Sequence, residues 1–345
     1  MKARSFVSMF LVGLALLQAS CIAPQAAPAG SQAPKSGGAA AGAKPVVALV
    51  YGVKNDGFYI TMEKGVRDKA AELGMDVIAD GPAQFDPVQQ KPILDAVIAQ
   101  NPAAICIAAT DKQAMIEPIK AAFDKGIHIF SVDTFIGSTA GDYTKGDITF
   151  PLSYIGSDNV EGGKIACKAV IDAMGGKGKM YIQNVKPGIS TTDQREQGCK
   201  EAIDATNGAV TLVGTDYNGD DSSKAAEQTS AVLAANKDLG GIFGTNLFSA
   251  RGAAQAVQNA GLTGAIKIAN FDAPEDAVKA LQDKVVDLVI AQHPYEIGQT
   301  CVQYANDAIN GKTDQIKKRF ATGYTVITRD NVDKPESQQA IYKSK

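Results

Sequence analysis

Polar side chains that could hold a hydroxyl-rich ligand recur just after the apolar runs of this sequence. They are carboxylates, carboxamides and one guanidinium, with aromatic rings beside them. The residues are Asp56, Phe58, Tyr59, Asp133, Asp193, Arg195, Tyr217, Asn246, Asp272 and Gln292. A hydroxyl group both donates and accepts, so carboxylate and amide oxygens can accept from it while guanidinium and amide N–H groups donate to it. Aromatic rings can cover the apolar face of such a ligand. The set predicts a binding site for a small polyhydroxylated molecule.

Several of these residues also have a purely structural interpretation. Asp133, Asp272 and Asn246 could each cap the turn or helix that follows. Arg195 could support neighbouring carboxylates or stand exposed in a first helical turn, and Tyr217 could lie on a surface turn. The two adjacent aromatic residues could belong to the core. The prediction of a site therefore depends on the whole set meeting at one place.

The elements that would position these residues alternate regularly from Pro45 onward. The expected strands are 46–51, 76–79, 103–109, 127–132, 178–184, 210–216, 241–244, 266–271 and 286–292. The expected helices are 61–73, 87–100, 112–125, 160–174, 194–206, 222–235, 250–261 and 274–282, the third with Asp111 as its N-cap. Apolar strands that alternate with helices are typical of parallel sheets covered on both faces. Because 137–151 has no periodicity and separates the two series, we predict an α/β fold of two doubly wound parallel-sheet lobes, with ligands bound beyond the carboxyl ends of the strands.

Composition and motifs argue against several other classes of protein. Charged residues make up 21% of the chain and the formal net charge is -3, which gives no basic stripe for nucleic acid. Four widely spaced body cysteines and two histidines do not form a zinc pattern. The glycine run at 175–178 precedes a strand, so it is neither a dinucleotide fingerprint nor a phosphate-binding loop. We therefore predict no catalytic residue, no metal and no cofactor.

The beginning of the chain has the organisation of an export signal. Lys2 and Arg4 precede an apolar run at 6–17, which is too short to span a bilayer. Small residues stand before Cys21, and 24–44 is rich in Ala, Pro, Gly, Ser and Gln. This segment resembles a bacterial lipoprotein signal, except that Gln18 stands where such signals usually carry Leu. The prediction is a signal peptide at 1–20, lipidation at Cys21 and a flexible tether at 21–44; an ordinary cleaved signal or a retained anchor are the alternatives.

The body of the chain resembles the periplasmic sugar-binding proteins of ABC importers, in their ribose/galactose-type branch. The motifs that carry the resemblance are ALV at 48–50 leading to GFY at 57–59, IGSDNVEGGKIA at 155–166, REQG at 195–198, GTN at 244–246, NFDAP at 270–274 and IAQHPYEIG at 290–298. The resemblance implies an extracytoplasmic monomer that captures a sugar or polyol by hinge closure and delivers it to a membrane permease. It implies ligand contacts at Asp56, Phe58, Tyr59, Asp133, Asn246, Asp272 and Gln292.

The resemblance also implies three crossings between the lobes. These lie near Tyr154, near Gln292 and at 318–322, which gives an N-terminal lobe of 45–154 plus 293–322 and a C-terminal lobe of 155–292 plus 323–345. Three departures from the ribose-binding pattern bear on the ligand: Asp56-Gly57 replaces Asn-Pro, Thr134 replaces Arg, and Asp193 replaces a sugar-binding Arg. They favour a ligand other than ribose. A receptor for a non-sugar hydroxylated signal, such as an autoinducer, is the alternative, since the run at 192–194 is similar to one in such receptors.

The four body cysteines allow two intralobe disulfides. Cys167 and Cys199 lie on the first two expected helices of the second lobe and are the favoured pair. Cys106 lies in a strand of the first lobe, and Cys301 begins a helix that the resemblance returns to that lobe, so a bridge there is the less favoured pair. The alternative is that all four are small buried apolar residues.

Overall fold

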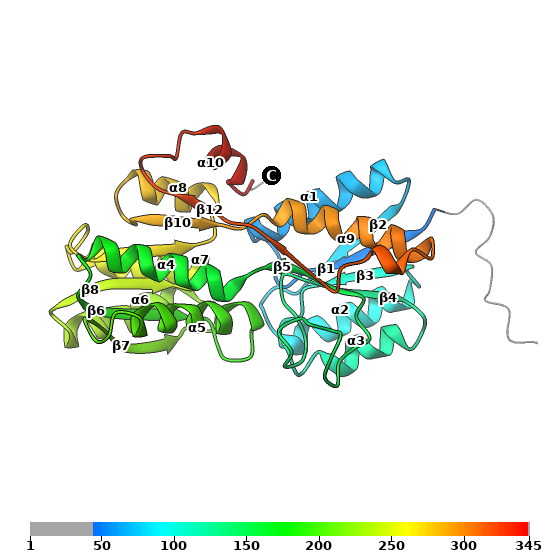
Figure 1. Cartoon of the computed structure of the whole chain (residues 1–345), viewed down its shortest axis with the longest axis horizontal. Helices are drawn as coiled ribbons and strands as arrows, with labels where there is room; N and C mark the ends of the chain where they lie inside the picture. The colour runs from blue at the N-terminus through cyan, green and yellow to red at the C-terminus, as the bar shows by residue number, and fades with distance from the viewer. Residues whose placement is uncertain (1–43, 344–345) are drawn as a thin grey trace, which may run out of the picture. The chain divides into compact units, whose positions relative to one another are not determined.

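The computed structural model describes residues 44–343, and their strands form two six-stranded sheets (Figure 1). In spatial order, the first sheet contains β11 (Arg319–Thr322), β5 (Ser153–Ser157), β4 (His128–Val132), β3 (Ala104–Ile107), β1 (Val46–Val50) and β2 (Asp76–Asp80). The second contains β12 (Thr325–Ile327), β10 (Leu288–Ala291), β9 (Lys267–Phe271), β8 (Leu239–Gly244), β6 (Gly178–Asn184) and β7 (Val210–Tyr217). All neighbouring pairs are parallel except β10 and β12. The predicted fold class is confirmed.

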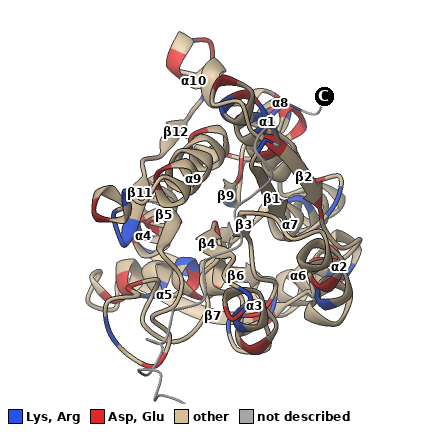
Figure 2. Ribbon diagram, turned by 90° about the vertical axis from the view of Figure 1, so that its right-hand side faces the viewer, with Lys and Arg blue, Asp and Glu red and all other residues tan. Residues whose placement is uncertain are grey.

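Helices cover both faces of each sheet (Figure 1). They are α1 (Gly57–Glu72), α2 (Pro87–Ala99), α3 (Ile116–Phe123), α4 (Asn159–Ala173), α5 (Ser190–Asp204), α6 (Ser222–Ala235), α7 (Leu247–Asn259), α8 (Glu275–Gln282), α9 (Pro294–Ile309) and α10 (Pro335–Ala340), with a short 3-10 turn η1 (Thr313–Gln315). Acidic and basic residues are interspersed along these helices (Figure 2). Among residues 44–343, no helix is both long enough and apolar enough to cross a membrane. The predicted signal peptide, most of the tether and Cys21 lie outside the described residues.

Three connections carry the chain between the sheets. They follow β5, β10 and β11, so that α4 packs on the second sheet while α9 returns to pack against α1 and β4. The first connection begins after Ser157 and not near Tyr154, as the resemblance implied. Residues 155–157 therefore belong to the sheet of the first lobe, because Ile155 pairs with Val132 and Ser157 pairs with Thr322.

One expected helix begins later than its sequence pattern indicated. The residues at 112–115 form a turn, and α3 begins at Ile116 instead of Lys112. Asp111 caps this turn instead of a helix, since its Oδ1 accepts hydrogen bonds from the backbone N–H groups of Gln113 and Ala114, both at 2.8 Å. Cys301 likewise stands inside α9 and not at its start.

Each lobe contains a pair of helices that approach each other backbone to backbone through a glycine on each helix. A Cβ atom on Gly65 of α1 would lie 2.2 Å from the carbonyl oxygen of Tyr295, at the start of α9, and a Cβ atom on Gly298 of α9 would lie 2.3 Å from that of Met62. In the second lobe, Gly163 of α4 and Gly198 of α5 have the same relation. Their Cβ atoms would lie 2.1 Å and 1.9 Å from backbone oxygens of the facing helix. Only glycine permits these approaches.

One disulfide lies within each lobe. Cys167 and Cys199 join α4 to α5 with a Cα–Cα distance of 5.1 Å. Cys106 and Cys301 join β3 to α9 with a Cα–Cα distance of 6.3 Å. Both distances fall within the usual range for a bridge. The structure therefore contains the favoured pair and also the less favoured one, which fixes α9 to the first sheet after the chain has passed through the second lobe.

Candidate ligand-binding site between the lobes

A cavity lies where the carboxyl ends of the strands of both sheets meet. Its lining residues are Val53, Asp56, Phe58, Tyr59, Phe85, Asp133, Val185, Ile189, Thr191, Thr192, Arg195, Asp220, Asn246, Asp272 and Gln292. Eight of the ten predicted site residues are in this set. The structure therefore brings together side chains that are separated by more than two hundred positions in the sequence, from Asp56 to Gln292.

The start of α1 supplies one acidic and two aromatic side chains. Asp56 is the N-cap of α1, and its Oδ1 accepts a hydrogen bond from the backbone N–H of Phe58 at 2.7 Å. Burial, reinforced by the nearby carboxylate of Asp272, raises the pKa of Asp56 to about 7. Phe58 and Tyr59 are buried in the same helical turn and line the cavity. Asp56 thus both caps a helix and faces the ligand space.

Asp133 holds a strained backbone conformation at the end of β4. Its φ angle is 59°, a region that non-glycine residues enter rarely. The backbone N–H of Asp133 donates to the carbonyl oxygen of Ile155 at 2.9 Å, and the Tyr59 hydroxyl donates to Asp133 Oδ2 at 2.7 Å. Burial raises the pKa of Asp133 to about 6, and the positive charge of Arg195 opposes this rise. Strain of this kind is typical of functional positions.

Asp272 occupies the corresponding place at the end of β9. Its φ angle is 76°, and its backbone N–H donates to Ile290 at 2.9 Å. Asp272 Oδ1 accepts hydrogen bonds from Gln292 Nε2 at 2.7 Å and from the Tyr342 hydroxyl at 3.1 Å. The Tyr342 hydroxyl also accepts from the backbone N–H of Gln292 at 2.8 Å. Sequence reasoning missed Tyr342, because it follows the last recognised motif and no spacing connects it to the site.

The start of α7 adds an amide and brings in another carboxylate. Asn246 is the N-cap of α7, since its Oδ1 accepts from the backbone N–H of Ser249 at 3.0 Å, and its Nδ2 donates to Asp220 Oδ1 at 2.7 Å. Asp220 lines the cavity with a φ angle of 69°, and burial raises its pKa. Sequence reasoning overlooked Asp220 and selected Tyr217 after the same strand. The available signal was the Asp-Asp pair at 220–221, of which Asp221 caps α6.

Arg195 is a buried residue of the cavity and not an exposed one. Only 2% of its surface is accessible. Its Nε donates to Asn159 Oδ1 at 2.9 Å and its Nη1 donates to the carbonyl oxygen of Thr245 at 3.0 Å. The guanidinium carbon lies 3.8 Å from the centre of the Phe271 ring, within the range of a cation–π contact. These contacts fix the guanidinium plane while leaving N–H groups to face the cavity.

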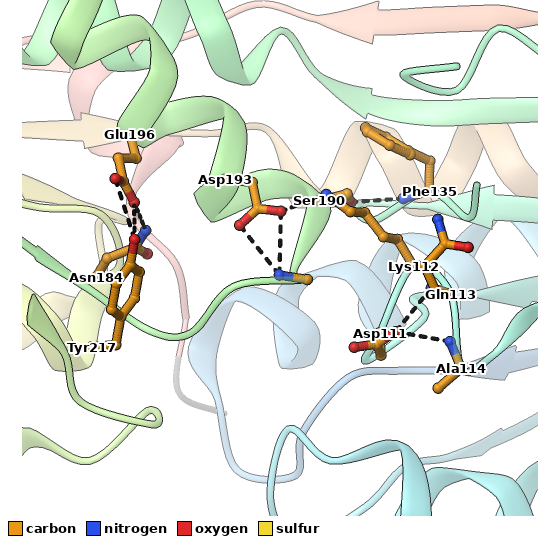
Figure 3. Close-up of polar contacts among 11 residues, drawn as sticks. Asp111, Lys112, Gln113, Ala114, Phe135, Asn184, Ser190, Asp193, Glu196 and Tyr217 are labelled. Carbon is orange, nitrogen blue, oxygen red and sulfur yellow. Dashed lines mark hydrogen bonds and ion pairs between the residues drawn. The ribbon is translucent and has the colours of Figure 1, made fainter. Parts of the chain in front are cut away.

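Asp193 and Tyr217 are the two predicted site residues that the structure does not place in the lining of the cavity. Asp193 forms an ion pair with Lys112, with Oδ2 and Nζ 2.6 Å apart, instead of facing the ligand space or pairing with Arg195. Tyr217 is 37% exposed, and its hydroxyl donates to Glu196 Oε2 at 3.2 Å (Figure 3). Asp193 lies in the first turn of α5 and Tyr217 is the last residue of β7, and neither side chain lines the cavity.

The lining has a surplus of hydrogen-bond acceptors. Four carboxylates, those of Asp56, Asp133, Asp220 and Asp272, face a single guanidinium. The hydroxyl of Thr192 also lines the cavity, is buried and has no hydrogen-bond partner within the described residues. A buried polar group of this kind normally has a partner, so it marks a place for a ligand atom. Within residues 44–343, no cluster of His, Cys, Asp and Glu could hold a metal ion. The arrangement suits a neutral ligand that carries many hydroxyl donors.

Comparison with known proteins identifies similar chains. The ribose import binding protein RbsB of Bacillus subtilis is 27% identical over 269 residues, which cover 78% of this chain and 83% of the relative. The D-allose-binding periplasmic protein of Escherichia coli is 28% identical over 263 residues, which cover 76% of this chain and 83% of the relative. An ABC transporter solute-binding protein from Agrobacterium vitis, solved with bound α-D-tagatopyranose, is 48% identical, with a TM-score of 0.84 and coverage of 87% of this chain and 100% of that chain.

The match to a family description covers most of the two-lobe body. The family is described as "Periplasmic binding protein domain", and the match extends over residues 47–313. It begins at the first strand and ends beyond α9, so it includes the first two connections and both sheets except their edge strands β11 and β12. Together with the two doubly wound lobes and the cavity between them, this shows that the chain belongs to the periplasmic binding protein family.

Proposed function

We propose that this chain is the extracytoplasmic solute-binding component of an ABC importer and that its ligand is a neutral hexose in pyranose form. The observation that carries the proposal is the convergence of Asp133, Asp272 and Arg195, from both lobes, on one cavity. The 48% identity to a protein solved with α-D-tagatopyranose makes D-tagatose the first ligand to test. The chain acts by binding and not by catalysis.

Hinge closure would complete the site. Phe58 and Asp133 belong to one lobe while Arg195 and Asp272 belong to the other, so a ligand reaches all of its partners only when the lobes meet. A ligand shifts the balance between open and closed forms only if it binds one of them better, and this division supplies the difference. The closed, monomeric form then docks on a permease, and a lipid on Cys21 would keep it near the membrane.

The acceptor surplus predicts which sugars the cavity should reject. Four carboxylates in a buried site repel a phosphate or a carboxylate on the ligand, while they can accept from every hydroxyl of a neutral hexose. The alternative of a receptor for a non-sugar signal depended on the run at 192–194. Asp193 lies outside the cavity, so no observation now favours that alternative.

Isothermal titration calorimetry with D-tagatose, D-allose, D-fucose and D-ribose tests this function. We expect the tightest saturable binding for D-tagatose, weak binding for D-ribose, and no binding for a hexose phosphate or a uronate. The variant Asp172→Asn, which changes an exposed ion pair on α4, is the matched control and should bind like the wild type. Absence of saturable binding to any of the neutral sugars would contradict the proposal.

A further inference from the structure

Two segments from different lobes meet outside the cavity (Figure 3). The turn at 111–114 follows β3 in the first lobe, and the loop at 185–189 leads from β6 into α5 in the second. Lys112 Nζ lies 2.6 Å from Asp193 Oδ2. The backbone N–H of Lys112 also donates to the carbonyl oxygen of Gly188 at 3.1 Å. One residue of the first lobe thus makes two bonds to the second.

The backbone on both sides is shaped for this contact. In the first lobe, Asp111 caps the turn, and the carbonyl oxygen of Lys112 accepts from the backbone N–H of Gly137 at 2.7 Å. In the second lobe, Asp193 Oδ1 and Oδ2 both lie 3.3 Å from the backbone nitrogen of Gly188. Gly188 has a φ angle of +98°, and a Cβ atom there would lie 2.8 Å from Asp111 Oδ2. A side chain at this position would be strained and would separate the segments.

The ion pair is separate from the cavity. Lys112, Gly188 and Asp193 are absent from the lining, and the two charged side chains remain 30% and 27% exposed. Two other interlobe bonds adjoin the cavity more closely: Lys186 Nζ donates to the carbonyl oxygen of Phe85 at 2.9 Å, and the backbone N–H of Phe135 donates to Ser190 Oγ at 3.0 Å. The Lys112–Asp193 pair is therefore an interlobe contact between charged side chains that can be changed without changing the cavity wall.

We propose that Lys112 and Asp193 form a latch that determines how tightly the closed lobes hold the ligand, although neither residue touches it. The apparent affinity of a ligand equals its intrinsic affinity reduced by the fraction of protein in the competent form. A contact made only when the lobes meet raises that fraction. Because the pair is charged and partly exposed, salt screens it and should speed ligand release. The inference rests on the proposed function for its sugar measurements only.

Three variants test the latch with D-tagatose as the probe. Lys112→Met and Asp193→Asn should each weaken binding by about 5- to 30-fold, which corresponds to about 1–2 kcal/mol at 1.4 kcal/mol per tenfold, and the loss should lie in faster release. The reversed pair, Lys112→Asp with Asp193→Lys, should recover affinity to within about threefold, as expected for an electrostatic coupling. The controls Lys120→Met and Asp172→Asn each change an exposed ion pair whose two members lie in the same lobe, and both should bind like the wild type.

The salt dependence separates a latch from a general structural support. Wild-type affinity should fall between about 20 and 500 mM salt, whereas that of Lys112→Met should stay nearly constant. The free energy of unfolding of ligand-free Lys112→Met should match that of Lys120→Met. Equal affinity of Lys112→Met and wild type at low salt would overturn the proposal, as would a reversed pair that binds no better than the single variants.

A measurement without sugar keeps the latch testable if D-tagatose does not bind. A water-soluble carbodiimide joins an amine and a carboxylate in contact: an amide forms between Lys112 Nζ and the Asp193 carboxyl carbon, one carboxylate oxygen is transferred to the carbodiimide, and the carbodiimide becomes a urea. We expect peptide mass spectrometry to detect this cross-link in the wild type, with a lower yield at high salt. Failure of wild-type calorimetry would refute the proposed ligand, while absence of the cross-linked peptide would refute the latch.

Discussion

The two lobes have the same strand order but hold their site residues by different means. Each position in the first sheet has a counterpart in the second, β4 with β9 and β5 with β10 among them. Asp133 and Asp272 are therefore equivalent, and both have a positive φ angle and a backbone bond to the adjacent strand. One hydroxyl, that of Tyr59, donates to the carboxylate of Asp133, whereas Gln292 and Tyr342 both donate to the carboxylate of Asp272. The shared backbone places an acceptor, and the surrounding side chains determine how firmly it is held.

The helices that begin at the cavity extend this difference. In the first lobe, α1 presents Phe58 and Tyr59, which offer apolar faces. In the second, α5 presents Arg195 and α7 presents Asn246, which offer N–H donors. A sugar has both apolar C–H faces and polar edges, so one lobe can cover a face while the other reads the hydroxyls. The first lobe thus supplies the apolar faces and the second lobe the N–H donors, and this difference comes from the N-terminal parts of these helices and not from the sheets.

The largest expected effect is a loss of folding stability when the disulfide of either lobe is removed. The bridge in the second lobe spans a sequence separation of 32, and the bridge in the first lobe spans 195. In the chain-entropy model these loops correspond to about 4 and about 5 kcal/mol of stability. Chemical denaturation of Cys106→Ser/Cys301→Ser and Cys167→Ser/Cys199→Ser should therefore show a greater loss in the first variant. Equal losses would mean that loop length does not control the difference.

The next largest effect is a loss of ligand affinity, and it should differ between variants of the two equivalent aspartates, Asp133 and Asp272. Removing Asp272 leaves Gln292 Nε2 and the Tyr342 hydroxyl without their acceptor as well as a ligand hydroxyl, whereas removing Asp133 leaves Tyr59. Hydrogen bonds to charged groups contribute about 1.5–3 kcal/mol each. Calorimetry with D-tagatose should show a loss of about 100-fold for Asp272→Ala and about tenfold for Asp133→Ala. A larger loss of affinity for Asp133→Ala would contradict the view that Asp272 is the more firmly held aspartate. Unchanged affinity in Asp272→Ala would refute the site.

A pH effect of about tenfold follows from the carboxyl groups of the first lobe. Burial raises the pKa of Asp56 to about 7 and that of Asp133 to about 6. Hydroxyl donors favour the ionised form, so binding lowers these pKa values and releases protons. Affinity should therefore rise with pH between about 5 and 8. Calorimetry at pH 6.5 in buffers of different ionisation enthalpy should detect proton release, and Asp56→Asn should reduce it; proton uptake would contradict the mechanism.

The same groups predict the pH dependence of ligand-free stability. Their folded-state pKa values lie above the usual value of about 3.9, so the folded protein binds more protons than the unfolded chain in the interval between. The free energy of unfolding should fall as pH rises from about 4 to 7 and should then level off. Thermal denaturation of Asp56→Asn should show a shallower decline than the wild type. An identical slope in both proteins would assign the effect to other groups.

The smallest expected effect is the loss of affinity on removing the Tyr342 hydroxyl, which is the second group that donates to the Asp272 carboxylate. Tyr342→Phe removes the hydroxyl that donates to Asp272 and accepts from the backbone N–H of Gln292, but it keeps the ring beside Phe58. A hydrogen bond to a charged group contributes about 1.5–3 kcal/mol, but Gln292 Nε2 still donates to Asp272 in this variant, so affinity should fall by only about threefold to tenfold. Tyr304→Phe, on a buried phenol of α9 away from the cavity, is the control. A full loss of binding would show that Tyr342 does more than orient the aspartate.

The sequence predicted nine of the strands because most of them are apolar runs, and it missed β5, β11 and β12. The stretch at 46–50 is an example, since all five residues of β1 are apolar and lie within the expected strand. It predicted less of the site, since a strand end shows which residue is near the cavity but not where its side chain points. Asp193 and Arg195 lie two positions apart on α5, yet one bonds Lys112 and the other enters the cavity. Tyr342 came to the site through the final connection between lobes, which no periodicity could reveal.

The reciprocal glycines have a consequence for mechanics. At Gly65 with Gly298, and at Gly163 with Gly198, the paired helices touch through backbone atoms and leave no layer of side chains that could yield under load. Each lobe should therefore behave as a stiff lever, with bending concentrated in the three connections. A small rotation in the connections produces a large displacement at the far edge of each lobe. The backbone geometry of these few residues must therefore be more accurate than that of residues elsewhere in the chain.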